Sequence, residues 1–201
     1  MDNYRVSRDR AQAYFLGFDQ AAMVKNWQLK ADEASVYVEF FGRPYRICRT
    51  TGKIFRLWED AQAEFEEVLS IFDLLCHSDG SAQLTGEFAP VNSLKGREKQ
   101  AGVGTAFHHT AAAAFDQDPD GFRAACTALG GQPVNMGDMG FRFPVFGPLS
   151  VILKFYRSDE DFPASLTLLW DDALLRFVHY ETVFYMAGFL LSSIEKLRSG
   201  R

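Results

Sequence analysis

The segment between Leu149 and Leu197 constrains the fold of this chain more than any other, because it joins two short apolar runs to one long amphipathic pattern. The runs are residues 151–155 and 166–170, which are rich in Val, Ile, Leu, Phe and Trp. Near-continuous apolar runs of this length are typical of strands that are buried on both faces. We therefore expect two buried strands here.

The residues between the two runs form a short acidic segment, Asp159-Glu160-Asp161, followed by Phe162 and Pro163. Proline disfavours the helical conformation at the residue before it, so this sequence predicts a turn. The side chains of Asp159 and Asp161 can order such a turn by accepting hydrogen bonds from backbone amides. We call residues 159–161 the acidic turn.

An amphipathic helix is expected to close the fold from Val183 onward. Its apolar positions recur at helical spacing and form one stripe, at residues 183, 184, 187, 190, 191, 194 and 197. Lys196 and Arg198 fall in its last turn, where cations interact favourably with the helix dipole. We expect this stripe, with Leu190 and Ile194, to be buried on the sheet formed by the two strands.

The N-terminal part of the chain predicts two helices and then three antiparallel strands. Residues 4–18 place apolar side chains along one helical stripe, and Asp19 is suited to cap a second helix that runs to Asn26. Short turns then separate three strands, at residues 35–41, 45–48 and 53–57.

The middle of the chain alternates helices with extended pieces. Asp60 is expected to cap a helix that ends near Gly80, and Asp118 followed by Pro119 starts another that ends at Gly130. The remaining expected elements are an extended piece at 84–91, a helix opened by Thr105 and a strand at 141–146. Together they predict a single α+β domain over residues 1–201, with a mixed or antiparallel sheet and packed helices that include the amphipathic C-terminal one.

Composition limits the classes of partner. The 201 residues are 47% hydrophobic and 23% charged, as in a soluble globular protein. A net charge of −5 argues against nucleic acid, since phosphate binding needs a basic surface. No apolar run approaches the ~18 residues of a membrane span. We therefore expect neither a nucleic acid nor a membrane as the partner.

The cysteines indicate a reducing compartment. Cys48, Cys76 and Cys126 are widely separated and form no CxxC pair, no zinc-ligand spacing and no disulfide framework. The N-terminal residues also lack the apolar core of a signal peptide. We expect reduced thiols in a cytoplasmic protein.

Several short motifs occur together along the chain. They are Leu129-Gly130-Gly131, Gly137-Asp138, Asp159-Glu160-Asp161-Phe162-Pro163-Ala164, Leu168-Leu169-Trp170-Asp171, Thr85-Gly86-Glu87-Phe88 and Gly104-Thr105-Ala106-Phe107. In these motifs the chain resembles a bacterial and archaeal family, the domain of unknown function numbered 3786, over roughly residues 34–197. Trp170 stands where Phe is usual in that family, a conservative change for packing.

The resemblance implies a domain more than a reaction, because the family has no established activity. Some of its members carry cysteine-rich iron–sulfur segments or lie beside corrinoid proteins. This chain lacks a cysteine-rich segment, so the resemblance identifies no cofactor for it.

The first candidate site is the acidic turn together with His179 and Glu181. Further carboxylates that could join it are Asp138, Asp171 and Asp172. Carboxylates gathered with one histidine could bind a hard divalent cation or take part in acid–base chemistry, and on a strand His179 and Glu181 would share a face. The alternative, which we favour, is that the acids order the turn and that Glu181 stabilises the start of the last helix.

The second candidate is an anion site at the start of a helix. Gly102, Gly104 and Thr105 are preceded by basic residues that include Lys99, and exposed amides at a helix N-terminus attract anions. A solvated loop is the favoured alternative, because the third glycine of a dinucleotide-binding motif is absent.

Neighbouring His108 and His109 do not predict a metal site. Adjacent residues on a helix point about 100° apart, and His108 shares a side with apolar positions. The chain also contains no other metal-ligand spacing and no motif of nucleophilic catalysis, so no metal site is expected.

Three kinds of function follow from these patterns. The leading hypothesis is a non-catalytic module that binds a small molecule or a protein. The second is an enzyme that uses the acidic turn with His179, with or without a metal. The third is a structural protein or homo-oligomer that buries Trp27, Trp58 or Tyr185 against another chain. Acids that wall a closed pocket would favour the enzyme, whereas acids in water beside exposed aromatic residues would favour the interaction protein.

Overall fold

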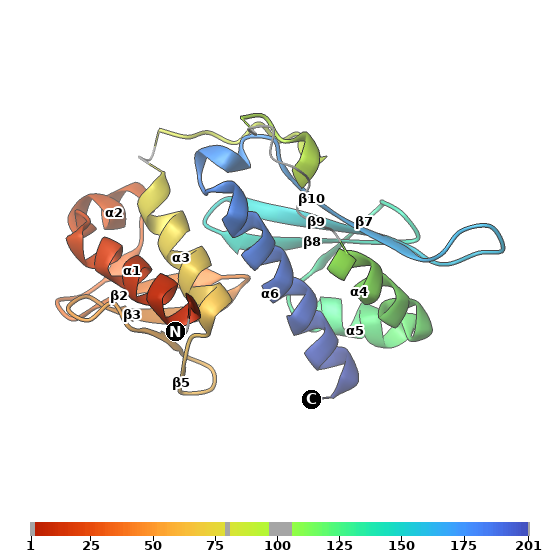
Figure 1. Ribbon diagram of the computed structural model, residues 1–201, viewed down its shortest axis with the longest axis horizontal. Coiled ribbons are helices and arrows are strands. Elements are labelled where there is room, and N and C mark those ends of the chain that lie inside the picture. Colours follow the sequence, from red (N-terminus) through yellow and green to blue (C-terminus); the bar gives the residue numbers. More distant parts are fainter. Residues whose placement is uncertain (1–2, 79–80, 97–105, 201) are drawn as a thin grey trace.

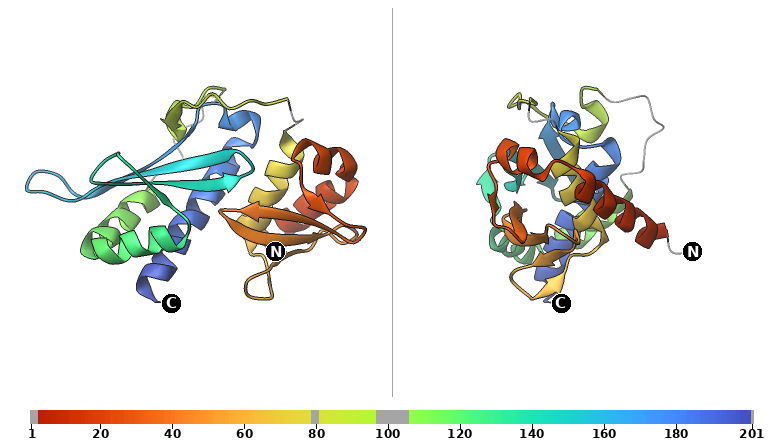
Figure 2. Two further views of the ribbon diagram at one scale, coloured as in Figure 1. Left: turned by 180° about the vertical axis from the view of Figure 1, so that it is seen from behind. Right: turned by 90° about the vertical axis from the view of Figure 1, so that its left-hand side faces the viewer.

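The computed structural model describes residues 3–78, 81–96 and 106–200. It contains two antiparallel sheets, one within residues 3–78, which we call the N-terminal half, and one within residues 81–200, which we call the second half; α-helices pack on both sheets (Figure 1). Seen from behind, the two sheets face the viewer and the helices of both halves lie beyond them (Figure 2). The predicted α+β class is confirmed.

The N-terminal half begins with α1 (Asn3–Gly17) and α2 (Gln20–Asn26) and continues into a five-stranded meander. Its strands are β1 (Lys30–Ala31), β2 (Ser35–Phe40), β3 (Arg43–Cys48), β4 (Ile54–Arg56) and β5 (Ala61–Gln62). Each strand pairs with the next along the chain. The three predicted strands are the central ones, and the two short edge strands complete the sheet.

Of the two helix caps predicted in this half, the structure confirms one and contradicts the other. The carboxylate of Asp19 accepts hydrogen bonds from the amides of Ala21 and Ala22, each at 3.0 Å, so the predicted cap of α2 is confirmed. The predicted cap at Asp60 is wrong, because α3 (Phe65–His77) begins after Glu64. Asp60 instead has a positive φ of 49° in the turn before β5, whose pairing with β4 delays the helix.

The second sheet has the order β6-β10-β9-β8-β7. Its strands are β6 (Phe88–Pro90), β7 (Gln132–Val134), β8 (Met139–Phe146), β9 (Leu149–Tyr156) and β10 (Ser165–Asp171). The two apolar runs are therefore strands, as predicted, and they pair antiparallel from Ser165 opposite Tyr156 to Trp170 opposite Val151. Near-continuous burial of β9 explains why its sequence does not alternate.

The helices of the second half are α4 (Ala106–Gln117), α5 (Pro119–Ala128) and α6 (Tyr180–Ser199), with short 3-10 turns η1 (Val91–Ser93) and η2 (Leu174–Arg176). The predicted cap of α5 is confirmed, since Asp118 accepts from the Gly121 amide at 2.9 Å. Gly130 ends this region with a φ of 78°, a left-handed conformation that favours glycine.

The last helix, α6, connects the two halves. It lies between α3 and α5, in front of the second sheet (Figure 1). Leu190 and Ile194 are buried, as predicted, whereas Leu197 at the end of the stripe is 44% exposed. The rings of Phe40 and Phe41, at the end of β2, lie 5.1 and 5.5 Å from that of Phe189 on α6.

A backbone hydrogen bond also joins the two sheets, from the Phe41 amide to the Val145 carbonyl at 2.9 Å. The buried apolar side chains of both halves form one cluster. Among the described residues, no helix combines the length and the hydropathy that crossing a membrane requires.

Candidate functional site

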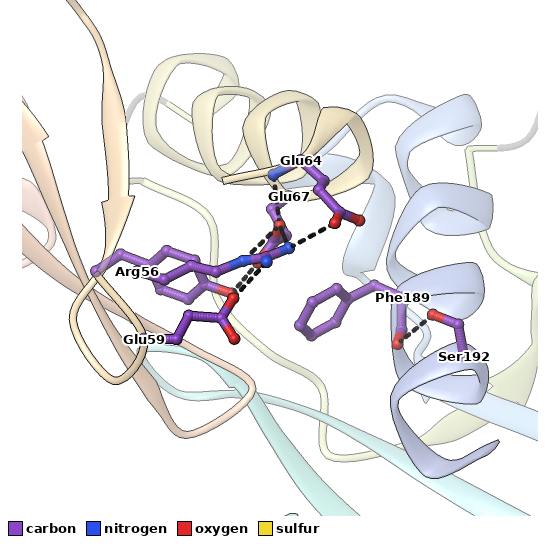
Figure 3. Close-up of polar contacts among 7 residues, drawn as sticks. Arg56, Glu59, Glu64, Glu67, Phe189 and Ser192 are labelled. Atoms are coloured by element: carbon purple, nitrogen blue, oxygen red, sulfur yellow. Dashed lines mark hydrogen bonds and ion pairs between the residues drawn. The ribbon is translucent and has the colours of Figure 1, made fainter. Parts of the chain in front are cut away.

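A polar cleft of about 270 Å³ opens where α6 faces the N-terminal sheet and the start of α3 (Figure 3). Its walls come from three separate stretches of the chain: Arg43, Arg56, Trp58 and Glu59; Glu64, Glu66 and Glu67; and Phe189, Ser192, Ser193, Lys196 and Leu197. Because α6 closes the cleft, only the packing of the two halves creates it.

Arg56 is the organising cation of this cleft. Its Nε donates to both carboxylate oxygens of Glu67, at 2.8 and 3.1 Å, and its Nη1 donates to Glu59 (Figure 3). Glu64 lies 3.5 Å from Nη2. The hydrogen bonds that Arg56 donates to Glu67 raise the pKa of Arg56 above its ordinary value, since they favour the charged guanidinium.

Glu67 is 1% exposed and is fully engaged. Besides Arg56, it accepts from the Tyr45 hydroxyl at 2.6 Å and from the Glu64 amide at 2.6 Å. Burial, together with the charge of Glu67, raises the pKa of Tyr45, so this phenol acts as a donor. A buried carboxylate needs such partners because an unpaired charge in the interior is costly.

Glu66 is the carboxylate of the cleft whose negative charge is least offset by neighbouring groups. Burial raises its pKa, and the like charges of Glu64 and Glu67 raise it further, while Lys196 acts in the opposite direction. Its carboxylate packs against Gly188 of α6, where an added Cβ would lie 3.0 Å from Oε1. A cation that entered the cleft would favour the ionised form of Glu66.

Aromatic side chains form the remaining wall. The guanidinium of Arg43 lies over the Trp58 ring at 5.1 Å, a cation–π contact. Trp58 is 37% exposed and also packs edge-on against Tyr45. The cleft thus combines an exposed aromatic ring with a partly buried carboxylate, which are the two groups that bind organic cations in proteins.

The acidic turn lies at the tip of the β9–β10 hairpin, which projects from the molecule (Figure 1). Asp159 accepts from the amides of Asp161 and Phe162, at 2.9 and 2.7 Å, so it orders the turn. All three acids are exposed. His179 follows the other end of β10, and seven strand residues span roughly 20 Å, so the structure does not bring His179 to the turn.

His179 and Glu181 do not share a strand, because α6 begins at Tyr180, earlier than the stripe indicated. His179 is the residue before the helix, and Glu181 lies in its first turn, where an acid favours the dipole. The His179 ring instead contacts Asp73 and His77 of α3.

The other carboxylates support the backbone of the second half. Asp171 accepts from the amides of Thr85, Gly86 and Ala173, at 2.8 to 3.1 Å, and so joins two of the motifs that carry the family resemblance. Asp172 accepts from the Lys95 amide at 3.0 Å, and Asp138 from the Arg157 amide at 2.8 Å.

The anion-site candidates Lys99, Gly102, Gly104 and Thr105 lie outside the described residues. Of the two histidines on α4, His108 is partly buried and His109 is exposed, in line with their divergence on a helix. Burial lowers the pKa of His108 to about 4, which favours its neutral form.

Sequence reasoning missed the central residues of the cleft. Glu64, Glu66 and Glu67 resemble ordinary acids in the first turn of a helix, where the dipole favours them. Nothing near Arg56 in the sequence identifies Glu67 as its partner. Asp73 and His77 lie four residues apart on a predicted helix, so the sequence could have identified them as a pair. Their neighbour His179, however, is 106 residues from Asp73.

Comparison with known proteins identifies the chain at the level of a family. No curated protein and no solved structure matches it. A family model described as "Domain of unknown function (DUF3786)" matches residues 19–193, which include nearly all elements of both halves. The chain therefore belongs to this family, the domain of unknown function DUF3786.

Proposed function

We propose that this protein is a binding module whose cleft takes a small molecule or a peptide side chain with a cationic group. One observation carries the proposal: Glu66 is a partly buried carboxylate, beside two other acids, on the wall of a cleft that also presents Trp58. An ammonium or guanidinium group at this position would neutralise Glu66 and contact the aromatic ring.

The distribution of charges in the lining supports a cationic ligand. Arg56 is already paired with Glu59, Glu64 and Glu67, and Arg43 lies over Trp58. Lys196 is exposed, where solvent screens its charge. The acid that is left with the weakest compensation is Glu66, so the cleft complements a positive charge.

The same lining favours binding over catalysis. Among the lining residues there is no histidine and no cysteine. Its two serines are Ser192, whose hydroxyl donates to the Phe189 carbonyl at 3.1 Å, and Ser193, which is buried. A hydroxyl nucleophile requires a neighbouring base, and the hydrogen bonds of the described residues join neither serine to a carboxylate of the cleft.

A titration of the full chain tests this proposal. Putrescine, arginine ethyl ester and tetramethylammonium are compared with the neutral analogue 1,4-butanediol, and amide shifts of the cleft residues are followed by NMR. At least one cation should give saturable shifts, and butanediol should give none. Glu66→Gln should abolish saturation, whereas Glu160→Gln, at the exposed hairpin tip, should not. Equal responses in both variants, or the absence of saturation with every cation, would contradict the proposal.

A second candidate function, self-association through the β9–β10 hairpin, is favoured by a separate observation. Phe162 is 70% exposed and Tyr156 is 45% exposed on the projecting hairpin, beside the solvated acids of the turn. Exposed aromatic side chains of this kind are typical of contact surfaces. Sedimentation of the full chain should show a dimer that Phe162→Ser converts to a monomer. An unchanged sedimentation coefficient would reject this candidate.

A further inference from the structure

Three metal-ligating side chains meet where the end of α3 touches the start of α6. They are Asp73, His77 and His179. We propose that this cluster, which we call the Asp–His–His cluster, binds a divalent transition-metal ion such as Zn²⁺. The proposal does not depend on the ligand of the cleft.

The helices determine the position of each member. Asp73 and His77 are four residues apart in the last turns of α3, so their side chains lie on one face. His179 immediately precedes α6, and its ring centroid is 4.1 Å from that of His77. One potential ligand atom from each of the three residues lies within 4.8 Å of the others. Ligand atoms around a tetrahedral Zn²⁺ are about 3.3 Å apart, so small side-chain rotations suffice.

Asp73 is already oriented for coordination. Its Oδ2 accepts from the His179 amide at 2.8 Å and from the Thr182 hydroxyl at 2.5 Å. Its Oδ1 lies 2.6 Å from His179 Nδ1, at hydrogen-bond distance, so the carboxylate already faces the imidazole. A metal ion placed between these two atoms would take the place of this hydrogen bond.

The surroundings favour a cation with an open coordination position. The carbonyl end of α3 carries partial negative charge, which attracts a cation. The amide end of α6 opposes it, but the Asp73 carboxylate lies at that end and offsets it, accepting from the His179 amide and from the Thr182 hydroxyl. His77 and His179 are exposed, so water can complete the coordination shell. Two imidazoles and one carboxylate are a donor set that suits Zn²⁺.

A purely structural role explains only part of this arrangement. Asp73 stabilises the start of α6 through the His179 amide and Thr182, and that role needs neither imidazole ring. It gives no function to His77, whose exposed ring lies against that of His179. Substitution of His77 therefore distinguishes a metal site from a helix cap.

Zn²⁺ titration of the full chain by calorimetry tests the inference, with Co²⁺ absorption as a second measurement. We expect one equivalent of Zn²⁺ to bind, and Co²⁺ to give a visible spectrum without a thiolate band. His77→Gln should weaken Zn²⁺ binding at least tenfold. His109→Gln removes an exposed imidazole of α4 and should leave the affinity unchanged.

His77→Gln changes an exposed side chain, so the metal-free variant should melt at the temperature of the parent chain. Equal affinities in the parent, His77→Gln and His109→Gln would overturn the proposal. So would a thiolate-to-Co²⁺ band, which would assign the ion to a cysteine.

Discussion

At the residue scale, two buried carboxylates are satisfied in different ways. Glu67 is 1% exposed and Asp171 is 2% exposed. Glu67 is paired with the guanidinium of Arg56, whereas Asp171 is held by backbone amides and the Thr85 hydroxyl. Each arrangement offsets the cost of removing a charge from water, but the two respond differently to substitution and to pH.

Replacing Glu67 should reveal the cost of leaving Arg56 without its main partner. Glu67→Gln is expected to lower the free energy of unfolding by about 3–5 kcal/mol, because a largely buried cation loses its charged acceptor. Urea denaturation measures this loss. Glu64→Gln is the control: Glu64 is 68% exposed, and its substitution should cost less than about 1 kcal/mol. Equal losses in the two variants would contradict the central role of Glu67.

The environment of Asp171 predicts that the free energy of unfolding decreases in acid. Burial acts to raise the pKa of Asp171, but the amides of Ala173, Thr85 and Gly86 outweigh it and hold the pKa below its ordinary value. The unfolded chain then protonates first, near pH 4, so the stabilisation is complete above that pH and is lost as the pH falls through the lower, folded value. Urea midpoints measured between about pH 3 and pH 6 should fall less steeply for Asp171→Asn than for the parent chain. Parallel profiles would show that Asp171 does not contribute.

At the element scale, the β9–β10 hairpin and α6 illustrate two sources of order. The hairpin tip is solvated, so its conformation depends on local hydrogen bonds. The helix buries an apolar stripe, so its order depends on the neighbours that cover it. Local and tertiary stabilisation can therefore be measured separately within one segment of the chain.

In the hairpin, only one of the two aspartates of the turn should matter for stability. Asp159→Ala is expected to cost about 0.5–2 kcal/mol, because it removes an acceptor for two amides. Asp161→Ala should stay within about 0.5 kcal/mol, as expected for an exposed side chain. Chemical denaturation of both variants provides the comparison. Unchanged or increased stability in Asp159→Ala would refute the structural role of this side chain.

In α6, the buried stripe should respond strongly to truncation. Leu190 is 1% exposed, so Leu190→Ala is expected to cost about 2–5 kcal/mol through lost transfer energy and the cavity left behind. Leu197 belongs to the same stripe but is 44% exposed, and Leu197→Ala should cost less than about 1 kcal/mol. Thermal and urea denaturation of the matched pair would show whether burial, rather than helix propensity, sets the loss.

At the scale of the whole molecule, the two halves share one hydrophobic cluster, and α6 packs on both. The backbone bond between Phe41 and Val145 adds a direct link between the sheets. Such contacts couple the unfolding of the halves, because opening either one would expose apolar surface of the other. We therefore predict that the full chain unfolds in a single transition.

Removing α6 tests this coupling. A fragment that ends at Thr182 lacks most of the helix and should fail to accumulate in soluble form, because the sheet face that α6 covers would be exposed and would aggregate. The full chain expressed in parallel is the control. A soluble fragment that melts cooperatively would show that the fold does not depend on its last helix.

The sequence alone determined the elements whose signals are local. Asp19 and Asp118 mark helix starts, because a cap is made within three residues of itself. The apolar runs of β9 and β10 and the stripe of α6 also follow from residues near in the chain. The motifs that resemble DUF3786 led to the family for the same reason, since short motifs are read directly from the sequence.

Tertiary structure alone decided where the candidate sites lie. The sequence predicts a helix cap at Asp60, but β5 follows it and pairs with β4, so the helix begins later. No residue near Asp60 indicates that pairing. The cleft brings Arg56 and Glu66 opposite α6, and the Asp–His–His cluster joins residues 106 positions apart. Contacts over such separations depend on how helices and sheets pack, which the burial of distant apolar surfaces determines. The sequence pattern around each polar residue contains no record of that packing.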